Sequence, residues 1–68
     1  MNSKALDIKM LLLVKGKLTL LEIEQLLQCK TQVLILTLNW LLAENKINII
    51  KNNKKLYFQL NKSFVQTY

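Results

Sequence analysis

The sequence lacks histidine and arginine and contains a single cysteine, Cys29, and these scarcities exclude several kinds of chemistry. One cysteine cannot form an internal disulfide, and without histidine a structural zinc site has too few ligands. Only four side-chain carboxylates are present. They are scattered, so they cannot form an acid–base pair, and we expect no enzyme. Every cation is a lysine, which cannot make the planar bidentate contact of arginine to guanine or phosphate. We expect no cofactor, no metal and no small-molecule ligand.

Long apolar runs are also missing. No run approaches the roughly 18 to 20 residues that a membrane span needs. The longest run near the N-terminus, residues 10–14, is shorter than the roughly 7 to 15 apolar residues of a signal-peptide core. We therefore expect a cytoplasmic protein that does not enter membranes, with Cys29 reduced and packed in the core.

Apolar residues nevertheless make up 51% of this 68-residue chain. Small domains have a large surface for their volume, and they usually need a disulfide, a metal or association to be stable. Only association is available here. Residues 31–45 show this most clearly, because apolar side chains surround nearly the whole helix that their spacing predicts. Such a helix is normally buried on nearly all sides, so we expect another molecule to cover part of it.

Periodicity and capping signals predict three helices, over residues 4–14, 19–27 and 31–45. The first is expected to end at the only glycine, Gly16, which suits a left-handed cap. Thr19 and Glu22 fit the capping box that begins the second helix. The residues expected to face the core are Ala5, Ile8 and Leu12 of the first helix, Ile23, Leu26 and Leu27 of the second, and Leu34, Thr37, Leu38 and Leu41 of the third.

Two segments of alternating polarity, 47–51 and 55–60, follow the third helix and predict a β-hairpin. The asparagines at 52–53 tolerate the positive φ of a two-residue turn. A turn centred there pairs Ile49 with Leu56 and turns the apolar residues of both strands to one face.

The order of these elements predicts one winged helix-turn-helix domain over residues 1–68, with its core at 4–60 and a tail at 61–68. The fold class is α+β and mainly α. It has three helices, a C-terminal β-hairpin as the wing, and a short strand at Leu18 before the second helix.

Four stretches carry a resemblance to a known family: GKLT at 16–19, EI at 22–23, LNWLLAENKI at 38–47 and KLYFQL at 55–60. Together they resemble a family of small, single-domain bacterial winged helix-turn-helix proteins of unknown function, over roughly residues 5–60. The most specific part is the tryptophan-leucine pair followed by the E-x-K-I exit. The sequence departs from the family pattern at Asn39 and Asn45, where glycine is usual, and at Val33 and Ile35, where polar residues are usual. The resemblance implies a DNA-binding fold and, for some members, homodimers.

Charge is distributed unevenly. Residues 1–17 carry a net charge of +3, residues 18–45 of −2 and residues 46–68 of +5. A basic surface suits the phosphates of nucleic acid. If the third helix enters a major groove and the wing meets the backbone, the candidate contacts are Lys30, Gln32, Asn39, Lys51, Lys54 and Lys55. Two alternatives stay open: the polar helix residues can be ordinary surface, and the wing lysines can protect a sheet edge from aggregation.

The candidate dimer interface consists of the apolar residues left over from the core, namely Leu6, Met10, Leu13, Val33, Leu36 and Trp40. The sequence does not decide which helix flank forms the contact. Two functions remain as hypotheses. The first is a homodimeric protein that binds double-stranded DNA and regulates transcription. The second is a protein–protein interaction or dimerisation module that keeps the winged fold without reading DNA sequence.

Overall fold

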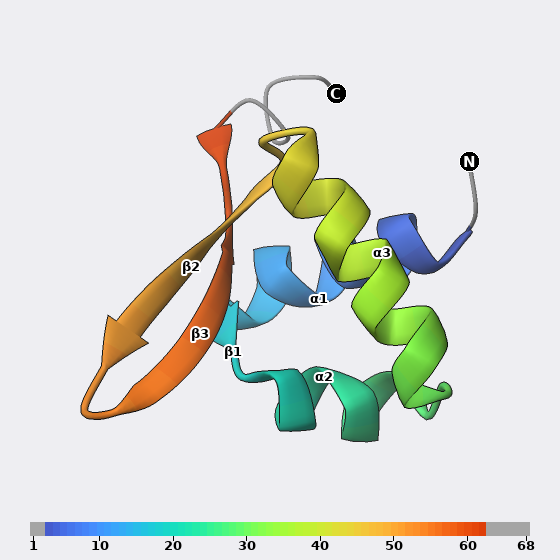
Figure 1. The fold of residues 1–68 in the computed structure, drawn as a ribbon, viewed down its shortest axis with the longest axis horizontal. Helices are drawn as coiled ribbons and strands as arrows, with labels where there is room; N and C mark the ends of the chain where they lie inside the picture. Colours follow the sequence, from blue (N-terminus) through green and yellow to red (C-terminus); the bar gives the residue numbers. More distant parts are fainter. Residues whose placement is uncertain (1–2, 63–68) are drawn as a thin grey trace.

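The computed structural model of the protein describes residues 3–62, and within them three helices and a three-stranded antiparallel sheet follow one another in the predicted order (Figure 1). The helices are α1 (Ser3–Lys15), α2 (Leu20–Leu27) and α3 (Thr31–Ala43), and the strands are β1 (Lys17–Leu18), β2 (Ile47–Asn52) and β3 (Lys55–Leu60). The sheet order is β1-β3-β2. This arrangement confirms the predicted winged helix-turn-helix fold. Positions 63–68 of the predicted tail lie outside the described residues.

Local capping contacts fix both ends of the link between α1 and α2. The N–H of Gly16 donates to the Leu12 carbonyl at 2.8 Å, and Gly16 has a φ of +88°, as its predicted role as a helix cap requires. At the start of α2, the Thr19 N–H donates to the Glu22 carboxylate at 2.8 Å. The Glu22 N–H donates to the Thr19 hydroxyl at 3.2 Å, which completes the predicted capping box.

The turn between α2 and α3 is closed by its own residues. Gln28 caps α2 in the left-handed conformation, and its N–H donates to the Glu24 carbonyl at 2.9 Å. The hydroxyl of Thr31, the first residue of α3, donates to the Glu24 carboxylate. Cys29 is partly buried against the core, as predicted. The two helices of the helix-turn-helix are thereby tied together across a short connection.

The last residue of α3 is Ala43, two residues before the predicted boundary, and the left-handed residue that follows the helix is Asn45, as predicted. Asn45 has a φ of 59°. The Asn45 N–H donates to the Leu42 carbonyl and the Lys46 N–H to the Leu41 carbonyl, at 3.1 and 2.8 Å. This is the bond pattern of a Schellman motif, and it turns the chain directly into β2.

The hairpin register differs from the predicted one by two residues. The turn lies at Asn53 and Lys54, which have φ values of 51° and 65°, so Lys51 rather than Ile49 opposes Leu56. A shift of two leaves every side chain on its predicted face, so the alternation of polarity could not distinguish the two registers. The observed turn also lengthens the hairpin by pairing Ile47 with Leu60 beside the core.

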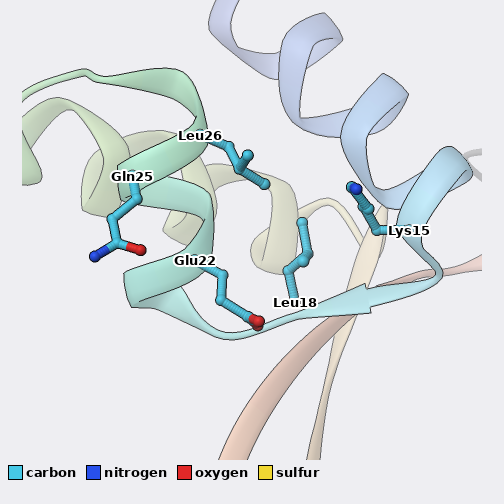
Figure 2. A pocket seen from close by; sticks show the side chains of 5 residues that line it. All are labelled: Lys15, Leu18, Glu22, Gln25 and Leu26. Atoms are coloured by element: carbon cyan, nitrogen blue, oxygen red, sulfur yellow. The ribbon is translucent and has the colours of Figure 1, made fainter.

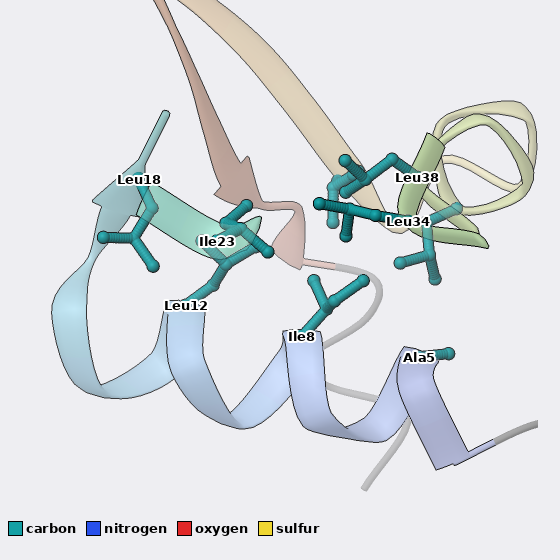
Figure 3. Packing of buried hydrophobic residues seen from close by; sticks show 9 residues of the cluster. Ala5, Ile8, Leu12, Leu18, Ile23, Leu34 and Leu38 are labelled. Atoms are coloured by element: carbon teal, nitrogen blue, oxygen red, sulfur yellow. The ribbon is translucent and has the colours of Figure 1, made fainter. Parts of the chain in front are cut away.

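The core lies between the helices and the base of the sheet. Side chains of α1 and α3 point toward each other within it, as Ile8, Leu34 and Leu38 show (Figure 3). Its buried apolar members are Ala5, Ile8, Leu12, Leu18, Ile23, Leu34, Leu38, Leu41 and Ile47. The predicted core faces of α1 and α3 are therefore confirmed. The prediction for α2 was wrong at Leu26, which is half exposed because the short helix buries little beyond Ile23 and Leu27.

Candidate nucleic-acid and subunit interfaces

The wing carries three exposed lysines around its tip. Lys54 is the second residue of the turn, Lys51 precedes the turn on β2, and Lys55 follows it on β3. Paired residues share a face of the sheet, so Lys51 lies on the face of Leu56 and Lys55 on the opposite face. The hairpin extends past the helices (Figure 1). Its tip therefore presents ammonium groups on both faces and at the turn.

Two of the three predicted polar contacts at α3 lie on one line of that helix. Gln32 and Asn39 are seven residues apart, close to two helical turns, and both side chains are exposed. Lys30 is the N-cap residue of α3 and is exposed as well. These three side chains lie on a single helix, well separated in sequence from the wing lysines.

A second line of α3 is apolar. Val33 and Trp40 are also seven residues apart, about 100° round the helix from the polar line, and both are exposed. Leu36 lies between the two lines and is 70% exposed. The centre of the surface that would face a groove is thus a leucine. The wing carries three lysines, whereas α3 has none between Thr31 and Ala43 and only Lys30 at its N-cap, so the two parts of the candidate site differ in character.

α1 carries the other predicted subunit contact. Leu6, Met10 and Leu13 are all about half exposed, and their spacing of four and three residues places them on one face. Val14, which was not predicted, extends this face and is 75% exposed. Val14 could have been predicted from the sequence, because it lies four residues after Met10 and therefore on the same helix face. Together Leu6, Met10, Leu13 and Val14 form the α1 ridge.

The structure separates the predicted dimer residues into two surfaces. α1 and α3 turn their buried faces toward the same core, so their outer faces point in different directions (Figure 3). The α1 ridge is one surface. Val33, Leu36 and Trp40 of α3 form the other. One flat contact with another molecule is therefore not expected to cover both.

The carboxylates of α2 take part in local structure. Glu22 accepts from Thr19, and this backbone hydrogen bond holds the pKa of Glu22 below its usual value, with smaller contributions from the Thr19 hydroxyl and from the charge of Lys55. Burial acts in the opposite direction and is outweighed. Glu24 accepts from Thr31. The acidic character of the helix-turn-helix thus stabilises helix termini as well as adding negative charge.

Sequence reasoning missed one cation beside the wing. The ammonium of Lys17, on β1, lies 5.0 Å from the centre of the Tyr57 ring on β3. The pairing of Lys17 with Gln59 places it on the outer face of the sheet, away from the core. The alternation of exposed Lys17 with buried Leu18 was the available signal. Lys9, by contrast, is buried and does not belong to the cationic surface.

An open pocket of about 300 Å³ lies between the end of α1, β1 and α2. Figure 2 shows Lys15 and Glu22 on opposite sides of it, with Leu18 between them and Leu26 on the same side as Glu22. One oxygen of the Glu22 carboxylate, Oε1, already accepts hydrogen bonds from the N–H and the hydroxyl of Thr19.

Within residues 3–62, no three metal-ligating side chains gather at one place. No helix in the described part of the chain is both long and apolar enough to cross a membrane. No model of a known protein family matches the sequence, and no curated protein matches it.

Proposed function

We propose that this protein is a homodimeric winged-helix protein that binds double-stranded DNA and regulates transcription in the cytoplasm. The observation that supports this proposal most directly is the wing tip, where exposed Lys51, Lys54 and Lys55 surround a tight turn. Lys54 occupies a left-handed position that favours glycine or asparagine, so a cation stands at the tip despite a steric cost. The protein is a binding protein in this proposal, not an enzyme, and it needs no cofactor.

Binding is directed mainly at the DNA backbone. Lysines at a wing tip can contact phosphates on either side of the minor groove, and such contacts are largely independent of base sequence. Gln32 and Asn39 are the side chains of α3 that can hydrogen-bond to adenine in the major groove. Leu36 can offer only apolar contact to a thymine methyl group. We therefore expect modest sequence preference.

The α1 ridge is the surface that we assign to the dimer contact. Its spacing of four and three residues repeats the pattern with which two helices pack along a common seam. Pairing through α1 leaves α3 and the wing exposed on both subunits, whereas pairing through α3 would cover the line that faces the groove. Of the two surfaces, only the α1 ridge is compatible with groove binding. The winged arrangement also supports, as a proposal, membership of the small bacterial family that the sequence resembles.

The test is a titration of a labelled random-sequence duplex at several salt concentrations. Replacing Lys51, Lys54 and Lys55 together by glutamine should weaken binding to all sequences alike. It should also reduce the slope of log affinity against log salt by about 2 to 3, because each phosphate contact contributes about 0.9.

The matched control for this titration changes the net charge equally at lysines away from the wing: Lys4, Lys15 and Lys62. The control triple variant should keep most of the salt slope. If both triple variants bind duplex equally well, or if the wild-type protein does not bind, the proposal is wrong.

A second candidate function is a protein-interaction module, and the exposed apolar line of α3 favours it. Replacing Leu36 by lysine separates the two functions, because the expected effects have opposite signs. On a groove-facing helix the added cation should strengthen duplex binding. On a protein-interaction surface the same change should abolish assembly with the partner and leave duplex binding weak.

A further inference from the structure

The outer edge of β2 carries backbone groups that no described strand pairs with. β2 lies at the end of the sheet order β1-β3-β2, so within residues 3–62 it has a strand neighbour on one side only. The Asn61 N–H donates to the Lys46 carbonyl at 2.9 Å, one pair before Ile47 opposite Leu60. Hydrogen-bonded pairs alternate along an antiparallel ladder. The odd-numbered residues Ile47, Ile49 and Lys51 therefore direct their N–H and C=O groups to the unpaired edge.

The side chains along this edge are suited to pack against an added strand. Ile49 is 47% exposed on the inner face of the sheet, and Ile50 is partly exposed on the outer face. A strand laid beside β2 would place its alternate side chains against these two isoleucines, one on each face. β-Branched residues at an open edge are the usual setting for strand addition, and β2 lacks the proline and the bulge that often prevent it.

The positive charge around the β2 edge favours an acidic partner over a second copy of the chain. Residues 46–68 contain five lysines and no aspartate or glutamate, and Lys51, Lys54 and Lys55 lie at or next to this edge. A second copy pairing edge to edge would bring two such cationic hairpins together, and lysine at an edge opposes that kind of self-association. An extended segment rich in carboxylates would instead be attracted, because its negative charges lie near the lysines while its backbone completes the ladder.

We propose that the edge of β2 is a docking site for an extended acidic segment of a partner protein, which adds a fourth strand to the sheet. The backbone of Ile47, Ile49 and Lys51 supplies the main-chain hydrogen bonds. Ile49 and Ile50 supply apolar contacts on the two faces, and the wing lysines supply the preference for acidic sequence. This site does not depend on DNA binding, so a failure of the duplex titration would leave it standing.

The probe is a blocked peptide of about eight residues that alternates valine with glutamate, within the usual length of a strand. The peptide should bind at low salt and bind at least several-fold more weakly at high salt. On binding, hydrogen exchange should slow at the amides of Ile47, Ile49 and Lys51. Two further peptides define the interaction. A lysine analogue should bind much more weakly, and a peptide N-methylated at every residue, which has no N–H group on either edge and cannot complete the ladder, should not bind.

The matched variants differ in one backbone N–H. Ile49→Pro removes the N–H that faces the edge, at a position where strands tolerate proline, and shortens the side chain by one carbon; it should reduce peptide affinity at least tenfold. Ile49→Val has the same number of side-chain carbons as the proline variant but keeps the N–H, and it should bind nearly as the wild type does. Thermal unfolding verifies that both variants are folded. If the proline variant is unfolded, the comparison with the N-methylated peptide still tests the proposal.

Three results would overturn the proposal. The first is equal binding of the N-methylated peptide. The second is an Ile49→Pro variant that is folded and binds the peptide with unchanged affinity. The third is protection of the same three amides by rising protein concentration without any peptide, which would assign the edge to a second copy of the chain.

Discussion

Lysine at position 54 combines a steric cost with a place at the tip of the proposed DNA contact. Outside glycine, the described residues with positive φ are Gln28, Asn45, Asn53 and Lys54. Asparagine tolerates this conformation, but a long side chain there costs about 1 to 2 kcal/mol. Gln28 closes the helix-turn-helix and Lys54 closes the wing, so the two strained positions fall at the two turns that define the fold.

Replacing Lys54 by glycine should raise the free energy of unfolding by about 0.5 kcal/mol, because relief of the steric cost exceeds the extra chain entropy of glycine. The same change should weaken duplex binding, since one phosphate contact is lost. Gln28→Gly is the control, with a similar gain in stability and unchanged binding. A fall in stability on Lys54→Gly, measured by chemical denaturation, would contradict the assigned turn.

The capping box of α2 predicts a dependence of stability on acid. The folded protein lowers the pKa of Glu22 below its value in the unfolded chain. Ionised Glu22 therefore contributes stability above the unfolded pKa, and this contribution is lost as the pH falls through the folded pKa. Thr19→Ala should cost about 1 kcal/mol at neutral pH. It should leave most of the acid dependence below about pH 4.3, where glutamate normally titrates, because alanine keeps the backbone N–H that donates to the Glu22 carboxylate.

Denaturation of wild type, Thr19→Ala and Glu22→Gln between neutral pH and pH 2 measures this effect. Glu22→Gln removes the titrating group and should flatten this part of the curve. If the difference between wild type and the Glu22→Gln variant is the same at every pH, the carboxylate does not stabilise the cap in its ionised form.

The helix α3 has two apolar faces, of which one is buried and the other exposed. Leu34 is 1% exposed and Leu36 is 70% exposed. Leu34→Ala should cost about 2 to 5 kcal/mol, because it leaves a cavity in the core. Leu36→Ala should change stability by no more than about 0.5 kcal/mol. Equal destabilisation by the two changes, in denaturant unfolding at low protein concentration, would mean that α3 is rotated from its described orientation.

Local signals explain which elements the sequence predicted well. Gly16, the Thr19–Glu22 box and the spacing of the buried residues of α1 and α3 each act within one or two helical turns, so the sequence contains the whole cause. Hairpin register depends on which two residues can both adopt positive φ, and a choice between Asn52-Asn53 and Asn53-Lys54 needs the three-dimensional pairing.

The sequence predicted which residues of the candidate sites are exposed, but not how these residues are grouped into surfaces. Hydrophobicity identified Leu6 and Trp40 as surplus to the core, and both are exposed. It could not show that they point in different directions, because that depends on how α1 and α3 pack against each other. The exposed edge of β2 was missed for the same reason, since the side-chain pattern contains no information on which strand lies outermost.

At the scale of the whole molecule, pairing through the α1 ridge predicts the effect of a single charge. Met10→Lys places a cation in the middle of that ridge and should convert a dimer to a monomer at micromolar concentration, measured by sedimentation equilibrium. The variant should remain folded, because Met10 is exposed. Its duplex affinity should fall as well, because two linked wings bind more tightly than one.

The control in this experiment is Leu36→Lys, which adds the same charge to the other apolar surface. It should leave the dimer intact. A dimer that survives Met10→Lys but is lost on Leu36→Lys would place the contact on α3, and would favour the interaction module over groove binding.

Because β1 is short, the two ends of the hairpin differ in stiffness. β1 pairs only with Gln59 and Phe58, so the sheet is three-stranded at its base and two-stranded from there to the turn. A lone two-stranded ribbon is only marginally stable in water. The part of the hairpin near the turn is consequently more easily bent than the part beside the core. It can bend to follow the surface of a bound molecule while the residues beside the core keep their positions.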